Sequence, residues 1–248
     1  MRIFLTSRAS FSVLLLSLLF FLLAAGCGIN VTTIAEESAA VNAPWKGEKF
    51  LPVKNIQQLP ELPSGCEITS AAIVLNYHGC KISKTELASY FQIGGMPRLT
   101  GGIKVGPDPW KVFAGDPQGS GYGCFAPVVT QAVTRYLSAA GRQLKAVNLS
   151  GTKAAALIPF INAGIPVIVW ATISMKEPYR GDGWILEGTG KDFRWPAREH
   201  CLVLIGYSGS DLLLSDPLDP QGTVLYSFSL FEKRYRQLHC QAVVVEPA

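Results

Sequence analysis

Residues 58–77 read QLPELPSGCEITSAAIVLNY, and this stretch decides the fold of the chain. Its second half carries apolar residues at i, i+3, i+4 and i+7, the spacing of one helix face: Ile68, Ala71, Ala72 and Leu75. The prolines upstream disfavour an earlier start, because a residue before proline stays extended. Ser64 or Gly65 suits the N-cap, so the pattern predicts that Cys66 lies in the first turn of the helix.

A cysteine at this position has two readings. Unpaired N–H groups and the positive end of the helix dipole favour a thiolate, which is the nucleophilic form of the side chain. The alternative is that Cys66 is a small buried hydrophobic residue, as most free cysteines are. The stretch alone leaves both readings open.

The composition of the chain limits its possible functions. Of the 248 residues, 48% are hydrophobic and 16% are charged, which allows a sizeable core and favours one domain. The net charge is +4, and Arg2 and Arg8 contribute to it in the leader. No cluster of Lys and Arg is interleaved with aromatic residues, so we expect no nucleic-acid partner.

The cysteines and histidines do not follow a metal-binding pattern. No C-x-x-C pair occurs among the six cysteines. A Cys/His site could be assembled from two pairs, His78 with Cys80 and His239 with Cys240, but both spacings are shorter than zinc ligands normally use. We therefore expect no metal and no cofactor.

Residues 1–27 are typical of a bacterial lipoprotein signal peptide. A positive start and a short apolar run lead to small residues before Cys27, the predicted lipidation site. The departure is Ala24, where such signals usually carry Leu, while Leu23 lies one position too early. The alternatives are an uncleaved anchor or ordinary secretion. We expect residues 28–50 to be a tether, and the protein to be anchored outside a bacterial membrane or secreted.

Secondary-structure signals from residue 51 onward place helices mostly in the first half and strands in the second. Two segments, 93–124 and 174–196, lack periodicity and are expected to be irregular. This order predicts an α+β domain over residues 51–248, with helices packed on an antiparallel sheet. The predicted helices cover about 66–78, 83–91, 127–141, 152–163 and 229–237, and the predicted strands 51–53, 144–148, 166–173, 200–207, 211–215, 223–228 and 241–246.

A cysteine nucleophile needs a base and a group that orients the base. His200 opens the strand HCLVLIGY, and Asp216 follows the next strand, LLLS. A turn near Gly209 would place His200 and Asp216 at the same end of a hairpin. The alternatives are a lone histidine at a strand edge and an aspartate that only begins a turn.

Three segments together resemble one family: GCEITSAAIVLNYHG, then EHCLVLIGY, then SDP. The chain resembles the papain-like cysteine peptidases related to the double-glycine leader peptidases of bacteriocin exporters, and above all their stand-alone bacterial branch. The likeness covers about residues 51–246. It implies Cys66 as nucleophile, His200 as general base and acid, and Asp216 as the orienting residue. It also implies Gln58 as an oxyanion donor, with the adjacent Gln57 as the alternative.

The expected activity is hydrolysis of peptide or amide bonds in a peptide or protein substrate. A surface binding module without turnover is one alternative, and an amidase or acyl-transferase with the same residues is another. The transporter-linked relatives cleave after Gly-Gly. We do not expect this specificity here, because nothing in the sequence encodes a transporter. Export favours disulfides, and we expect Cys124–Cys201, which would hold the long loop over the site.

Overall fold

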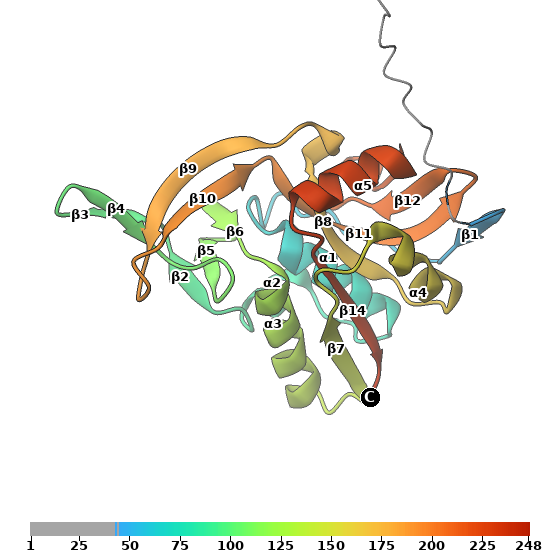
Figure 1. Cartoon of the computed structure of the whole chain (residues 1–248). Coiled ribbons are helices and arrows are strands. Elements are labelled where there is room, and N and C mark those ends of the chain that lie inside the picture. Colours follow the sequence, from blue (N-terminus) through green and yellow to red (C-terminus); the bar gives the residue numbers. More distant parts are fainter. Residues whose placement is uncertain (1–42, 44) are drawn as a thin grey trace, which may run out of the picture. The chain divides into compact units, whose positions relative to one another are not determined.

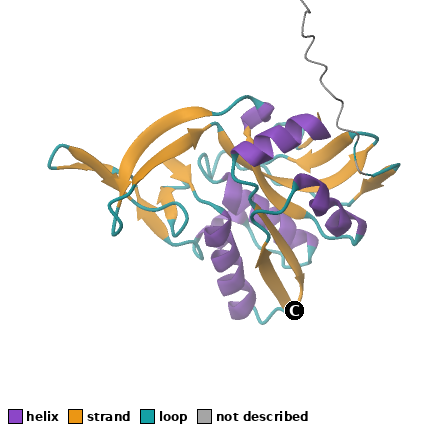
Figure 2. Cartoon of the chain, in the orientation of Figure 1, coloured by secondary structure: helices purple, strands orange, loops and turns teal. Residues whose placement is uncertain are grey.

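The computed structural model describes residue 43 and residues 45–248, so the leader and Cys27 lie outside the described residues. Within the described part, no helix combines the length and the apolar character that crossing a bilayer requires. The α+β architecture with an antiparallel sheet is confirmed, as Figures 1 and 2 show.

A seven-stranded antiparallel sheet forms the centre of the domain. Its strands follow the order β13-β12-β11-β8-β14-β7, and β1 pairs separately with β11. The buried strands β8 and β11 lie in the middle, as their continuous apolar sequences predict. The strands of this sheet are β1 (Glu48–Phe50), β7 (Leu144–Asn148), β8 (Val167–Thr172), β11 (Glu199–Ser208), β12 (Asp211–Ser215), β13 (Thr223–Ser227) and β14 (Ala242–Pro247).

Helices cover both faces of this sheet, and alternate residues of its strands point to different cores. On β8, Ile168 and Trp170 pack in the core that contains α1 and α3, whereas Val167 and Val169 pack with α4 and α5. The helices are α1 (Cys66–Tyr77), α2 (Lys84–Ala88), α3 (Ala126–Ala139), α4 (Ile158–Asn162) and α5 (Phe228–Gln237); two short 3₁₀ turns cover Ala154–Leu157 and Ile173–Met175.

The α1 helix is the central helix of the domain and packs on β11 (Figure 1). It begins at Cys66, with Gly65 as its N-cap, and ends before Gly79, whose positive φ of 77° suits glycine. The sequence predicts one apolar face, but every residue from Cys66 to Leu75 is buried, because strands, loops and α3 surround the helix.

The prediction of two irregular segments is wrong. Residues 93–124 and 174–196 contain seven strands, which form two smaller sheets, β10-β9-β4-β3 and β2-β5-β6. Several of these strands are only three residues long and Gly-rich, and β9 begins with the polar, Gly-containing run YRGDG, so hydrophobic alternation does not reveal them. The strands are β2 (Ile93–Gly95), β3 (Arg98–Thr100), β4 (Ile103–Gly106), β5 (Phe113–Gly115), β6 (Gly121–Gly123), β9 (Tyr179–Leu186) and β10 (Asp192–Ala197).

The start of the domain also differs from the expectation. The sequence predicts a strand at 51–53 and a tether up to residue 50, but the strand is β1, and it pairs with the far end of β11. The backbone N–H of Leu51 still donates to the Ile205 carbonyl at 2.9 Å. The folded unit therefore includes residues 48–50.

Candidate active site

Cys66 is the first residue of α1 and lies at a small cavity. Its side chain is buried, and its thiol donates to Glu67 Oε2 at 3.4 Å. Burial raises the pKa of this thiol, and the negative charges of Glu67 and Glu199 raise it further, well above its usual value. Of the two readings that the sequence left open, burial and the neighbouring carboxylates favour the neutral thiol in the resting structure, and the helix terminus acts against them.

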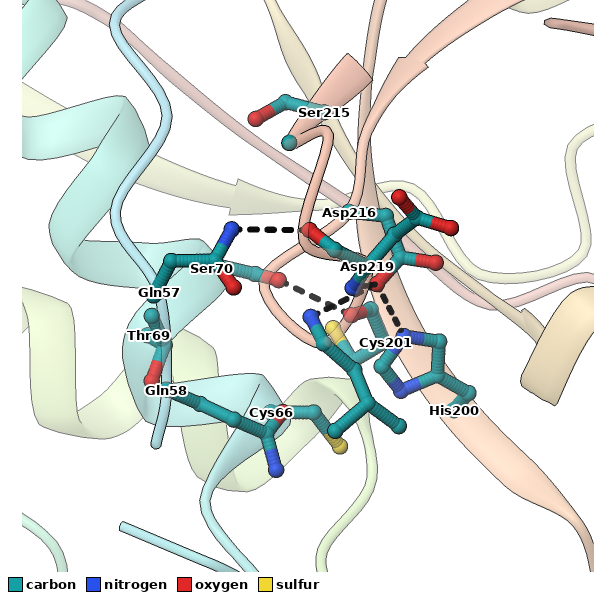
Figure 3. Close-up of polar contacts among 12 residues, drawn as sticks. Gln57, Gln58, Cys66, Thr69, Ser70, His200, Cys201, Ser215, Asp216 and Asp219 are labelled. Carbon is teal, nitrogen blue, oxygen red and sulfur yellow. Dashed lines mark hydrogen bonds and ion pairs between the residues drawn. The ribbon is translucent and has the colours of Figure 1, made fainter. Parts of the chain in front are cut away.

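His200 and Asp216 form a buried pair. His200 Nε2 lies 2.7 Å from Asp216 Oδ1 (Figure 3). The same carboxylate oxygen accepts the backbone N–H of Leu218 at 2.8 Å and that of Asp219 at 3.3 Å. A carboxylate that already accepts these bonds takes the Nε2 proton of a neutral imidazole, so Nδ1 is left as the basic nitrogen.

Opposing effects set the charge state of Asp216. Burial raises the pKa of its carboxyl, but the hydrogen bond and charge of His200, with the two backbone N–H groups, lower it more. The net pKa lies below the ordinary value of 3.8, so Asp216 is an anion at neutral pH.

A β-bulge brings these two side chains to the same face of the sheet. Ser208 pairs with Asp211, and this register alone would set Asp216 opposite Val203. The bulge between Leu204 and Gly206 shifts the register by one residue, so that Val203 pairs with Ser215. Asp216 then continues opposite Leu202, whose side chain shares a face with His200. The hairpin predicted from the sequence is correct, but without the bulge the two residues would face apart.

Gln58 and Gln57 occupy different environments. Gln58 is buried and lines the cavity, and its Nε2 donates to the Pro63 carbonyl at 3.1 Å. Gln57 is exposed, and its Nε2 binds Asn55 Oδ1 and the Asp219 carbonyl, each at 2.8 Å. Of the two candidates, the structure therefore brings Gln58 to the cavity of Cys66.

The backbone of both glutamines is fixed by the ammonium group of Lys84. Lys84 Nζ donates to the carbonyl oxygens of Gln57 and Gln58, and the second of these distances is 2.8 Å. The ammonium also forms an ion pair with Glu61 at 2.6 Å. Lys84 was not predicted as a functional residue, because its position after the N-cap Ser83 suggests only an ordinary solvated helix residue.

The cavity has a volume of about 240 Å³. Cys66, His200 and Gln58 line it, and the indole of Trp195 forms part of its wall. The three residues come from separate segments of the chain, and Figure 3 labels them together in one view. A larger hollow of about 530 Å³ over β9 and β10 contains none of the predicted site residues.

Sequence reasoning missed two buried carboxylates beside Cys66. Glu67 follows Cys66 on α1, and Glu199 precedes His200 on β11. Burial raises the pKa of Glu67 to about 7, although the backbone N–H of Cys124 donates to its Oε1 at 2.6 Å. The sequence contains a pattern that could have identified them, because GCE and EHC each place a glutamate next to a candidate catalytic residue.

The predicted disulfide is wrong, since the five cysteines of the described residues are all free. Both residues are fully buried, and their backbone carbonyls accept hydrogen bonds from other residues. Trp170 Nε1 donates to the Cys124 carbonyl at 3.0 Å, and Ser70 Oγ donates to the Cys201 carbonyl at 3.0 Å.

The cysteine–histidine set considered in the sequence analysis is not gathered into one cluster within the described part of the chain. The imidazole of His239 packs beside the indole of Trp110, with ring centroids 6.0 Å apart. His78 and Cys80 lie at the C-terminal end of α1.

Comparisons with known proteins identify the family of the chain. The sequence model of the Peptidase_C39 like family matches residues 50–243. Protein YvpB of Bacillus subtilis (strain 168) is 31% identical over 193 residues, which cover 77% of this chain and 73% of YvpB. A Bacillus anthracis protein, whose crystal structure is described as that of a C39-like peptidase, matches with a TM-score of 0.70 and 29% identity, over 82% of this chain and 99% of that chain. The chain therefore belongs to the Peptidase_C39 like family and is a cysteine peptidase, a hydrolase with a papain-like α+β fold.

Proposed function

We propose that this peptidase cleaves peptide bonds with Cys66 as nucleophile, His200 as general base and acid, and Asp216 as the residue that orients His200. Gln58 would be an oxyanion donor. The observation that carries the proposal is the 2.7 Å contact between His200 Nε2 and Asp216 at a cavity that Cys66 also lines. Peptide substrates follow from the family.

The protonation states define the first step. The raised pKa of Cys66 means that the resting side chain is a neutral thiol. His200 Nδ1 would therefore remove the proton while Sγ attacks the scissile carbonyl carbon, rather than before substrate binds. The carbonyl π electrons move to oxygen, and His200 then protonates the leaving amine as the C–N bond breaks. Water hydrolyses the resulting thioester, with His200 again accepting a proton.

Two N–H donors are available for the oxyanion. The backbone N–H of Cys66 opens a helix and therefore has no intrahelical acceptor. Gln58 Nε2 uses one of its two hydrogens for Pro63, which leaves the second for substrate. Loss of one such donor typically lowers kcat by about 10²–10³.

Trapping of the thioester tests the assignment. The full chain is incubated with a peptide library, quenched in acid and digested, and an acyl adduct is sought on the peptide that contains Cys66. We expect the adduct and turnover in the wild type, and neither in Cys66→Ala or His200→Ala. Asp216→Asn should retain a small fraction of the turnover, because Asp216 acts through His200. The matched control is Cys80→Ala, which removes a thiol at the other end of α1 and should leave turnover unchanged.

Turnover that persists in a folded Cys66→Ala variant would overturn the proposal. A folded wild-type protein that cleaves no member of the library would instead support the binding module. Added amine nucleophiles separate hydrolysis from acyl transfer, since transfer gives amide products in place of acids.

We also propose that Cys27 is lipidated and holds the domain outside the membrane. The support is the sequence LLAAGC at residues 22–27, after an apolar run. Mass spectrometry of the membrane fraction should find lipid on Cys27. An unmodified mature chain, cut elsewhere in the leader, would contradict this. More than one acyl chain is expected, since a single chain gives only marginal membrane binding.

A further inference from the structure

Three potential metal ligands converge behind the opening of the cavity. Ligand atoms of Cys66, Glu67 and Glu199 all lie within 4.8 Å of one another, and all three residues are buried. The distance from Cys66 Sγ to Glu67 Oε2 is 3.4 Å. A tetrahedral zinc ion with ordinary Zn–S and Zn–O bonds holds sulfur and oxygen ligands about 3.5 Å apart. The cluster therefore needs only a small contraction to become a coordination site.

Glu199 provides a second and independent observation. Its side chain is 7% exposed, and its Oε1 has no hydrogen-bond partner among the described residues. On β11 it alternates with His200, so it points to the α1 face of the sheet, where Glu67 and Cys66 lie. An unpaired buried carboxylate is costly, and a bound cation removes that cost.

We propose that Cys66, Glu67 and Glu199 bind one thiophilic divalent cation of the Zn²⁺ class. Three protein ligands and one open position are a common zinc arrangement, and a thiolate with two carboxylates suits Zn²⁺ better than Mg²⁺. Coordination forms a Zn–S bond as the thiol proton leaves to solvent, and the metal keeps its oxidation state. The ion enters through the cavity, which both Cys66 and Glu199 line.

The bound cation blocks the thiol of Cys66. The sulfur of Cys66 then donates its electrons to the metal. The coordinated sulfur attacks neither a carbonyl nor an alkylating reagent. If Cys66 is the nucleophile, as proposed above, Zn²⁺ is a reversible inhibitor of the peptidase. Occupancy of the site does not itself depend on that function.

The test measures metal binding directly, with the reduced full-length chain in detergent. Co²⁺ is added as a spectroscopic substitute for Zn²⁺, and thiolate-to-cobalt charge-transfer absorption is recorded. One equivalent should bind, and Zn²⁺ should displace it. Cys66→Ser should lose the absorption. Glu199→Gln, which keeps the shape of the side chain, should weaken Zn²⁺ binding by at least about tenfold. The control Cys80→Ser removes a thiol beyond the C-terminal end of α1, a helix about 18 Å long that begins at Cys66, and should bind like the wild type.

A second readout is alkylation of Cys66 by iodoacetamide, followed by peptide mapping. One equivalent of Zn²⁺ should slow it, and a chelator should restore it. Equal affinity in Glu199→Gln, loss of the absorption in Cys80→Ser, or no binding at all would overturn the site. Metal binding in a protein without any turnover would support the site and count against the proposed function. Turnover that is insensitive to Zn²⁺, in a protein without the cobalt absorption, would support the proposed function and overturn the metal site.

Discussion

The ammonium of Lys84 provides a sharp test of how the Gln58 segment is held. Lys84→Met keeps an unbranched apolar side chain but removes the ammonium that donates to the carbonyls of Gln57 and Gln58. The Gln58 carbonyl would keep one partner, the backbone N–H of Leu62 at 2.9 Å. The Gln57 carbonyl would depend on solvent. The variant should therefore loosen the backbone from which the Gln58 side chain reaches the cavity.

The magnitude follows from the contacts that are lost. A hydrogen bond from a charged group contributes about 1.5–3 kcal/mol, and Lys84 makes two close ones to carbonyl oxygens. Since Gln57 is exposed and can be solvated, we expect the free energy of unfolding to fall by about 3 kcal/mol. Complete loss of an oxyanion donor typically costs about 10²–10³ in kcat, so a loosened donor should cost about tenfold. KM should hardly change, because the interaction forms in the transition state.

Urea unfolding followed by tryptophan fluorescence gives the free energy of unfolding. Peptide hydrolysis without urea gives kcat and KM. The matched control is Glu61→Gln, which removes only the exposed partner of the ion pair and should behave like the wild type. Wild-type kcat in a destabilised Lys84→Met would refute the reasoning, since it would show that Lys84 supports the fold but not the position of Gln58.

Three further outcomes are expected. Gly123→Ala should lower the unfolding free energy in urea titrations by about 2 kcal/mol or more, because its Cβ would lie 2.1 Å from Glu67 Oε1 at a φ of +127°; an unchanged midpoint would contradict this. Gly206→Ala should detach β1, since its Cβ would lie 2.3 Å from the Lys49 carbonyl oxygen, and hydrogen exchange of residues 48–51 should accelerate while turnover persists. Folding lowers the pKa of Asp216, so the contribution of its carboxylate to stability is present above about pH 4 and is lost as the pH falls further. Asp216→Asn should therefore make the free energy of unfolding depend less on pH below about pH 4. The same pH dependence in both proteins would contradict this prediction.

Local sequence patterns predict the elements whose determining residues lie close together in the sequence. The apolar spacing after Cys66 predicts α1, and the Ser83 capping pattern predicts the start of α2, where Ser83 Oγ accepts the Glu86 N–H at 3.0 Å. The two apolar runs on either side of Gly209 predict the hairpin of β11 and β12. In each case the determining interactions lie within about ten residues of one another.

Features that depend on distant partners could not be predicted. The bulge between Leu204 and Gly206 depends on pairing with β12 and on the close approach of β1 to Gly206. Strands β4 and β9 are stabilised by each other across about 80 residues, so neither has a strong pattern of its own. The raised pKa of Cys66 comes first from burial, which distant segments of the chain provide, then from Glu67, and then from Glu199, which lies 133 positions away in the sequence. A helix N-terminus seen in the sequence does not reveal such a neighbour.

The pairing of β1 with β11 determines where the chain enters the domain. Glu48 lies opposite Ser208, at one end of β11, whereas His200 lies near the other end, eight residues away. At about 3.3 Å per residue, the entry point and His200 are separated by about 26 Å along the strand. An attachment through the N-terminus, to a membrane or to a solid support, would therefore hold the domain at the end of β11 that lies away from His200.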